Sequence, residues 1–149
     1  MRKQMSAEEL IEKIRGSFKH TKPPGNPIRD TGDVDGVDSV DLLNGFPPGA
    51  FWELIDQQVI DYNCHSFPFF NEMAYVYYLP SFLIRSLSNG EVYEFTFYSL
   101  TPVSVDLDLE TKKKLLTESQ LDCVRQFLCE AKTTKGFEIT KEMHYFWGI

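Results

Sequence analysis

The chain has 149 residues, of which 42% are apolar and 25% are charged, a composition that is typical of a globular domain and excludes a wholly disordered chain. The apolar run Tyr75–Leu79 is interrupted by Pro80 and is far shorter than the roughly 20 residues that cross a bilayer. The first residues lead into charged side chains rather than an apolar signal segment. We therefore expect a cytoplasmic protein that makes no membrane contact.

The net charge of −7 hides an uneven distribution along the chain. Residues 30–111 contain fourteen acidic residues and a single basic one, Arg85, which gives this segment a charge of −13. Residues 1–29 carry +4 and residues 112–149 carry +2. Binding to a phosphate backbone requires clustered lysines and arginines, so the pattern argues against nucleic acid and favours a basic protein as the partner. An acidic surface that serves only solubility is the simpler alternative.

The first predicted helix begins at the capping box Ser6–Glu9, where two side chains each satisfy a free backbone N–H. Apolar residues then recur at helical spacing as far as Phe18. Prolines, glycines and aspartates follow, and we predict a flexible surface loop at about residues 21–37. Asp38 or Ser39 is placed to cap a short helix that ends before the next proline pair.

The middle of the chain is the most apolar part. Residues 51–60 supply large rings for the core. Residues 68–87 repeat apolar side chains at helical spacing, which predicts the most buried helix, with a kink or break at Pro80. Residues 92–98 alternate imperfectly and favour a strand, and the clean alternation of residues 105–110 indicates an extended, exposed edge with three carboxylates on one side.

A second capping box, Thr117–Gln120, opens an amphipathic helix that continues to Ala131. Residues 137–149 are too aromatic for a frayed terminus, so we expect them to pack against the core. Together these patterns predict a mainly α fold, with α+β as the open alternative. We expect a single compact domain over residues 1–149, with four to six helices and room for a small β-hairpin.

Residues with catalytic or metal-binding chemistry are few. Three cysteines without a C-x-x-C pair predict free, buried thiols: Cys64, Cys123 and Cys129. The aspartate-rich residues 30–38 lack the first and last ligands of an EF-hand loop, and no zinc spacing or standard catalytic signature is present. We therefore assign no metal, cofactor or catalytic residue. Cys64, His65 and His144 are the candidates for a non-standard thiol site.

Three motifs follow one another along the chain: Trp52-Glu53-Leu54, the tyrosine-leucine-proline block Tyr77–Leu83, and Leu116–Gln120. Their order resembles a family of small, uncharacterised bacterial proteins with W-x-L, YYLP-x-F-L and LT-x-x-Q motifs. The resemblance spans roughly residues 38–130. It implies a shared domain and brings no established catalytic residues with it.

The acidic middle and the missing catalytic motifs lead to one hypothesis: a non-enzymatic protein-binding domain, such as a bacterial immunity protein that neutralises a basic toxin. We expect the partner to contact six acidic residues: Asp33, Asp35, Asp38, Asp106, Asp108 and Glu110. Two alternatives stay open. One is a cytoplasmic enzyme with a non-standard Cys/His site, and the other is a structural or regulatory module that dimerises through its aromatic tail. The sequence leaves the oligomeric state open.

Overall fold

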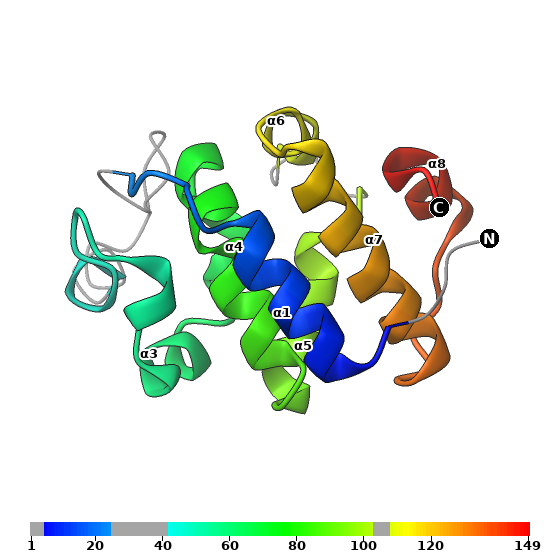
Figure 1. Ribbon diagram of the computed structural model, residues 1–149, viewed down its shortest axis with the longest axis horizontal. Coiled ribbons are helices and arrows are strands. Elements are labelled where there is room, and N and C mark those ends of the chain that lie inside the picture. The colour runs from blue at the N-terminus through cyan, green and yellow to red at the C-terminus, as the bar shows by residue number, and fades with distance from the viewer. Residues whose placement is uncertain (1–4, 25–41, 103–107) are drawn as a thin grey trace.

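A computed structural model describes residues 5–24, 42–102 and 108–149. Within these ranges every regular element is a helix, which confirms the mainly α expectation (Figure 1). Residues 42–45 are helical. The other α-helices and 3₁₀ helices (η) are α1 (Ala7–Ser17), η1 (Trp52–Leu54), α3 (Gln57–Tyr62), η2 (Phe67–Phe69), α4 (Glu72–Ser86), α5 (Gly90–Ser99), α6 (Leu109–Lys114), α7 (Glu118–Thr133) and α8 (Lys141–Trp147).

Helix α4 forms the centre of the fold because it is apolar on nearly every face. Eleven of its fifteen residues are buried, as expected for the most buried helix. The helix continues through Pro80 to Ser86, so the proline does not break it. Helices α1, α3, α5 and α6 all contact α4, and Figure 1 shows α1 crossing in front of it.

Both predicted capping boxes are present, and they begin α1 and α7, two helices that pack against each other. In α1, Ser6 Oγ accepts a hydrogen bond from the Glu9 N–H at 3.1 Å. In α7, Thr117 Oγ1 accepts one from the Gln120 N–H at 3.2 Å. The Gln120 side chain also donates to the Ser17 carbonyl at 3.1 Å, which fixes the start of α7 to the end of α1.

Trp52 joins three segments that are distant in the sequence. Its indole N–H donates to the Phe18 carbonyl at 3.1 Å, and its backbone N–H donates to the Tyr77 hydroxyl at 3.1 Å. The Ser81 hydroxyl donates to the Trp52 carbonyl at 2.7 Å. The W-x-L motif and the tyrosine-leucine-proline block are therefore parts of one buried network.

Residues 92–98 form helix α5, and the strand favoured from the sequence is wrong. Asn89 caps the helix by accepting hydrogen bonds from the N–H groups of Glu91 and Val92 at 3.0 and 3.4 Å. No strand occurs in the described residues, so the small hairpin is not observed there.

The helical period of α5 escapes the sequence pattern because half of its buried face is polar. That face consists of Val92, Tyr93, Thr96 and Ser99, which recur at helical spacing. Thr96 Oγ1 lies 2.8 Å from Ser86 Oγ, and Ser99 Oγ lies 2.8 Å from the Tyr75 hydroxyl. These hydrogen bonds to α4 allow the two polar side chains to be buried.

Several predictions fall on residues outside the described ranges. Residues 25–41 include most of the predicted loop and the proposed cap at Asp38 or Ser39. Residues 103–107 include the first half of the predicted extended edge, but its last residues, Leu109 and Glu110, belong to α6 and are helical. That part of the edge prediction is therefore wrong.

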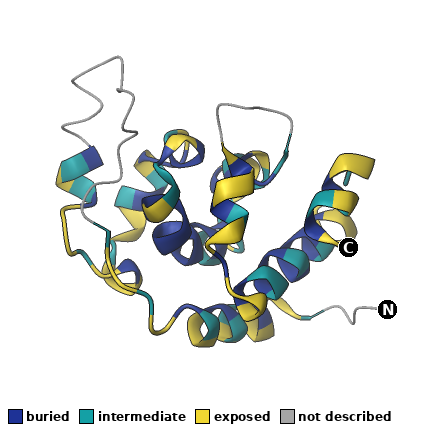
Figure 2. Cartoon of the chain, turned by 90° about the horizontal axis from the view of Figure 1, so that it is seen from above, coloured by how far each residue is buried: buried dark blue, intermediate teal, exposed yellow. Residues whose placement is uncertain are grey.

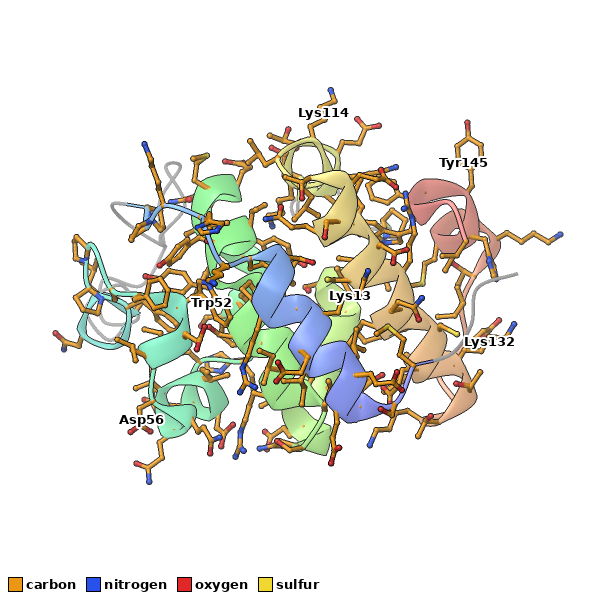
Figure 3. All side chains as sticks on the ribbon, viewed as in Figure 1. Lys13, Trp52, Asp56, Lys114, Lys132 and Tyr145 are labelled. Carbon is orange, nitrogen blue, oxygen red and sulfur yellow. The ribbon has the colours of Figure 1, made fainter. Side chains whose placement is uncertain are left out.

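The aromatic C-terminal segment packs on the core, as predicted. Met143 and Trp147 are buried, and the Trp147 indole N–H donates to the Leu100 carbonyl at 2.8 Å. Figure 2 shows buried residues lining the inner side of the helices. Tyr145 is 92% exposed and points away from the fold (Figure 3).

Candidate functional site

Two of the six acidic residues expected to contact a partner are described, and both lie at the start of α6. Asp108 and Glu110 are exposed there. Hydrogen bonding with the Thr111 side chain, and then with Glu72 at the start of α4, lowers the pKa of the Asp108 carboxyl. The remaining four lie outside the described residues: Asp33, Asp35, Asp38 and Asp106.

Lys112 ties the acidic start of α6 to η2. Its side chain is buried, its Nζ donates to the Pro68 carbonyl at 2.9 Å, and the same Nζ lies 4.4 Å from the centre of the Tyr75 ring. A buried ammonium requires a hydrogen-bond acceptor or an aromatic face of this kind. The contact places the carboxylates of α6 near the turn that carries Pro68.

A groove beside η2 has walls of exposed aromatic side chains, and we call it the aromatic groove. Its volume is about 360 Å³. Phe69 and Tyr98 are 40% and 41% exposed, and both rings lie in the lining of the same groove. The groove is lined by His65, Pro68, Phe69, Glu94, Phe95 and Tyr98.

The rings of the groove are exposed because their neighbours on η2 and α5 are the residues that face the core. Phe67 and Phe70 are buried on either side of Phe69, so the short turn η2 leaves Phe69 on the surface. On α5 the buried face begins at Val92 and Tyr93, which leaves Glu94, Phe95 and Tyr98 on the other side of the helix. A surface of aromatic residues thus forms where two short elements meet.

One carboxylate lines the aromatic groove, and a second lies one helical turn away. Glu94 lines it, and Glu91 lies one turn earlier on the same helix and is exposed. Arg85 is the single cation of residues 30–111, and Asp61 binds it through two contacts of 2.8 Å, Nε to Oδ1 and Nη2 to Oδ2. Because Arg85 is already paired, it does not offset the charge of Glu91 and Glu94.

The candidate thiol site does not assemble around Cys64. Cys64 is 3% exposed, and burial raises the pKa of its thiol, with Glu91 and Asp61 raising it further. A raised thiol pKa is unfavourable for a nucleophile, which reacts as the thiolate. The rings of His65 and Phe95 instead lie in a T-shaped arrangement with their centroids 6.5 Å apart, and His144 lines a different pocket.

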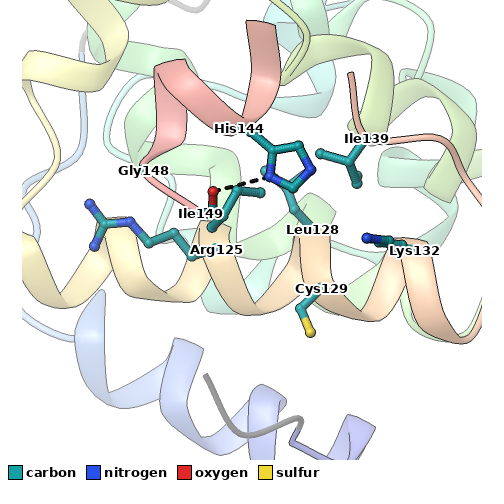
Figure 4. A pocket seen from close by; sticks show the side chains of 8 residues that line it. All are labelled: Arg125, Leu128, Cys129, Lys132, Ile139, His144, Gly148 and Ile149. Atoms are coloured by element: carbon teal, nitrogen blue, oxygen red, sulfur yellow. Dashed lines mark hydrogen bonds between the residues drawn. The ribbon is translucent and has the colours of Figure 1, made fainter. Parts of the chain in front are cut away.

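That second pocket, which we call the basic pocket, lies between α7 and α8 (Figure 4). Its volume is about 360 Å³, and it contains Cys129, the one cysteine of the three that is partly exposed. Arg125, Lys132 and His144 line it together with apolar residues. All three cysteines are free, as expected, but only Cys64 and Cys123 are buried.

The sequence analysis predicted neither the aromatic groove nor the basic pocket, although the residue spacing indicates part of each. Glu91, Glu94, Phe95 and Tyr98 have the spacing of one exposed helix face, a pattern hidden by the strand assignment. On α7, Arg125 and Lys132 are seven residues apart and therefore share a face.

Among the described residues, no group of three or more His, Cys, Asp or Glu side chains is placed to hold a metal ion. Nor does any described helix have the length and apolar character needed to span a membrane. The sequence profile of a family of unknown function (DUF6714) matches residues 6–147. Comparison with curated proteins and with solved structures found no match.

Proposed function

Since the chain belongs to DUF6714, a family of unknown function, we propose from its surface that it is a non-enzymatic domain that binds a basic protein. A bacterial immunity protein, which neutralises a toxin by covering a basic surface, is the form of this function that we favour. The aromatic groove with Glu94 in its lining is the observation that carries the proposal. Three properties support the proposal. They are the exposure of the aromatic rings in the groove, the carboxylate of Glu94, and the negative charge of residues 30–111.

The exposed rings supply binding energy. Aromatic side chains in a pocket that a partner can dehydrate are the residues that most often dominate protein interfaces. η2 and α5 fix the backbone of Phe69 and Tyr98, and each ring has only two side-chain torsions to order when a partner covers it. We assign them the role of interface anchors.

The groove fits a cationic side chain of the partner. An arginine guanidinium can stack on an aromatic face and pair with a carboxylate at the same time. Glu94 supplies that carboxylate, and Phe69, Phe95 and Tyr98 supply the rings. The partner therefore inserts an arginine or lysine here.

The surrounding charge contributes to the rate and specificity of association. Residues 30–111 carry −13, and Asp108 and Glu110 lie at the start of α6, the helix whose Lys112 contacts the carbonyl of the groove residue Pro68. Such a field accelerates the approach of a basic protein and weakens with salt. Asp33, Asp35, Asp38 and Asp106 contribute to it in the proposal.

The test begins with capture of the partner from host lysate by the tagged protein, with elution by salt, followed by measurement of the affinity for the purified partner. We expect Phe69→Ala and Glu94→Lys to weaken binding at least about tenfold, as hot-spot changes do. The pair Asp108→Lys and Glu110→Lys should slow association and reduce its salt dependence.

Glu142→Lys provides the control, because Glu142 is an exposed acid on α8 and does not line the groove. It changes the net charge as much as Glu94→Lys does. Equal effects of these two substitutions would show that the groove does not bind the partner. An affinity that responds to neither groove variant, or a partner without a basic surface, would contradict the proposed function.

A further inference from the structure

The two walls of the aromatic groove belong to separate elements. Pro68 and Phe69 come from η2, whereas Glu94, Phe95 and Tyr98 come from α5. Because η2 is a single 3₁₀ turn of three residues, it is too short to hold its shape alone. The spacing of the two walls therefore depends on the side chains that pack behind them.

Tyr75 of α4 contacts both elements from the inside of the fold. Its side chain is fully buried, and its ring stacks on Phe67 of η2 with the centroids 4.5 Å apart. Its hydroxyl lies 2.8 Å from Ser99 Oγ, at the end of α5 and next to the groove residue Tyr98. One residue of the central helix thus connects the η2 wall with the α5 wall.

Lys112 of α6 adds a charged contact to the same cluster. Its side chain is only 2% exposed, and its Nζ donates to the carbonyl of the groove residue Pro68 at 2.9 Å. The same Nζ lies 4.4 Å from the centre of the Tyr75 ring. An apolar side chain of similar length would fill this space without the cost of desolvating an ammonium. The hydrogen bond to a wall of the groove gives the buried charge a role other than filling space.

We propose that Lys112 and Tyr75 are positioning residues of the aromatic groove, which hold its two walls at the spacing that a cationic side chain of the partner requires. This inference deepens the proposed function and rests on it, because it concerns the same groove. A groove that is formed before binding loses less conformational freedom when the partner arrives. The two residues therefore contribute to affinity although neither of them lines the groove.

Amide hydrogen exchange, followed by NMR, measures how firmly each wall is held and needs no partner. In η2 the Phe70 N–H donates to the Phe67 carbonyl at 3.1 Å. At the end of α5 the Leu100 N–H donates to the Phe97 carbonyl at 3.0 Å. Exchange at these two amides reports local opening of the η2 wall and of the α5 wall, and amides in the middle of α7 provide the reference for the rest of the fold.

Two substitutions should loosen different walls. Lys112→Met removes the donor to Pro68 and should speed exchange at Phe70 about tenfold relative to the α7 amides. Tyr75→Phe removes one oxygen and keeps the ring, and it should speed exchange at Leu100 in the same way. Lys114→Met is the control, because Lys114 is exposed on α6 and points away from the fold (Figure 3).

A blocked Gly-Arg-Gly peptide is the probe for the groove, and the same peptide with glutamine in place of arginine is its uncharged counterpart. NMR titration of the folded wild-type protein should show tighter binding of the arginine peptide. Lys112→Met and Tyr75→Phe should each weaken that binding at least about threefold, and Lys114→Met should leave it unchanged. A role in global stability alone would leave the affinity of the folded protein unchanged.

The outcomes separate this inference from the proposed function. If the wild-type protein binds the two peptides equally, the groove does not select a cationic side chain, and both the proposed function and this inference are contradicted. If it prefers the arginine peptide and the Lys112 and Tyr75 variants bind that peptide as tightly as the wild type does, only the positioning role is overturned. Exchange that speeds up no more at Phe70 and Leu100 than in α7 overturns it too.

Discussion

Tyr93 and Glu130 form a hydrogen bond between α5 and α7 inside the core. The Tyr93 hydroxyl donates to Glu130 Oε2, and the two side chains are only 1% and 6% exposed. The Tyr93 ring is also stacked on Phe127 with centroids 4.7 Å apart. Burial first, and then the carboxyl of Glu130, raise the pKa of the Tyr93 phenol. This hydrogen bond therefore gives two buried polar groups a partner across the contact between α5 and α7.

Tyr93→Phe should destabilise the fold by about 1–3 kcal/mol, because it leaves a buried carboxyl without this donor. Glu130→Gln keeps an acceptor for the phenol and should cost less. Urea unfolding followed by circular dichroism measures both. Tyr145→Phe removes an equivalent hydroxyl from a side chain that is 92% exposed and should have no effect. If the Tyr93 and Tyr145 variants are equally stable, the buried hydrogen bond contributes nothing.

Helices α1 and α7 can be predicted from the sequence, whereas α5 cannot. Helices α1 and α7 combine a capping box with a regular apolar stripe, so local signals locate both helices. The inward face of α5 includes Thr96 and Ser99, whose burial depends on partners in α4 that no local pattern reveals. Tertiary hydrogen bonding overrides the strand preference there.

The candidate sites were less predictable for the same reason. Acidic residues are visible in a sequence, so Asp108 and Glu110 were correctly expected at the surface. The aromatic groove requires knowing that Phe69 faces outward while Phe67 and Phe70 face inward, which only the packing of η2 decides. Hydrophobic residues are usually assigned to the core, and that assumption conceals an exposed aromatic surface.

Alkaline pH should destabilise the fold through its buried tyrosines. Burial raises the pKa of Tyr78 to about 12, above the ordinary value of about 10 for an unfolded chain. The native state thus holds this proton more tightly, so the stabilisation is complete below pH 10 and is lost as the pH rises toward 12. Free energies of unfolding measured between pH 8 and 12 should fall, and Tyr78→Phe should reduce the slope. An unchanged slope would contradict this role for Tyr78.

The Asp61 and Arg85 ion pair should act in the opposite pH range. Hydrogen bonding with Arg85 lowers the pKa of Asp61 below its ordinary 3.8. Its stabilisation is therefore present above that value and is lost as the pH falls through the lower native pKa. Asp61→Asn should cost about 1 kcal/mol or less at pH 7, since the pair is partly exposed, and nothing near pH 2. A cost that stays the same at both pH values would rule out the ionic contribution, and Glu53→Gln, at an exposed acid, is the control.

Gly45 ends the helical turn of residues 42–45 where it meets α3, and the space there admits no side chain. A Cβ at Gly45 would lie 2.7 Å from Val59 Cγ1, a stiff branched group. Gly45→Ala should therefore destabilise the fold by about 1–3 kcal/mol through overpacking. The double variant Gly45→Ala with Val59→Ala should lose less than the sum of the two single variants, because the second change removes the clash.

Gly16→Ala in α1 separates steric clash from helix propensity. No atom outside the local helix lies within 4 Å of a Cβ at Gly16, so alanine should gain up to about 1 kcal/mol there from its higher helix propensity. Glycine-to-alanine substitution is therefore expected to lower the free energy of unfolding at Gly45 and to raise it at Gly16. Thermal or urea unfolding of both variants decides the matter. A stabilising Gly45→Ala would mean that Val59 can move away and that the contact between the turn and α3 is looser than the structure has it.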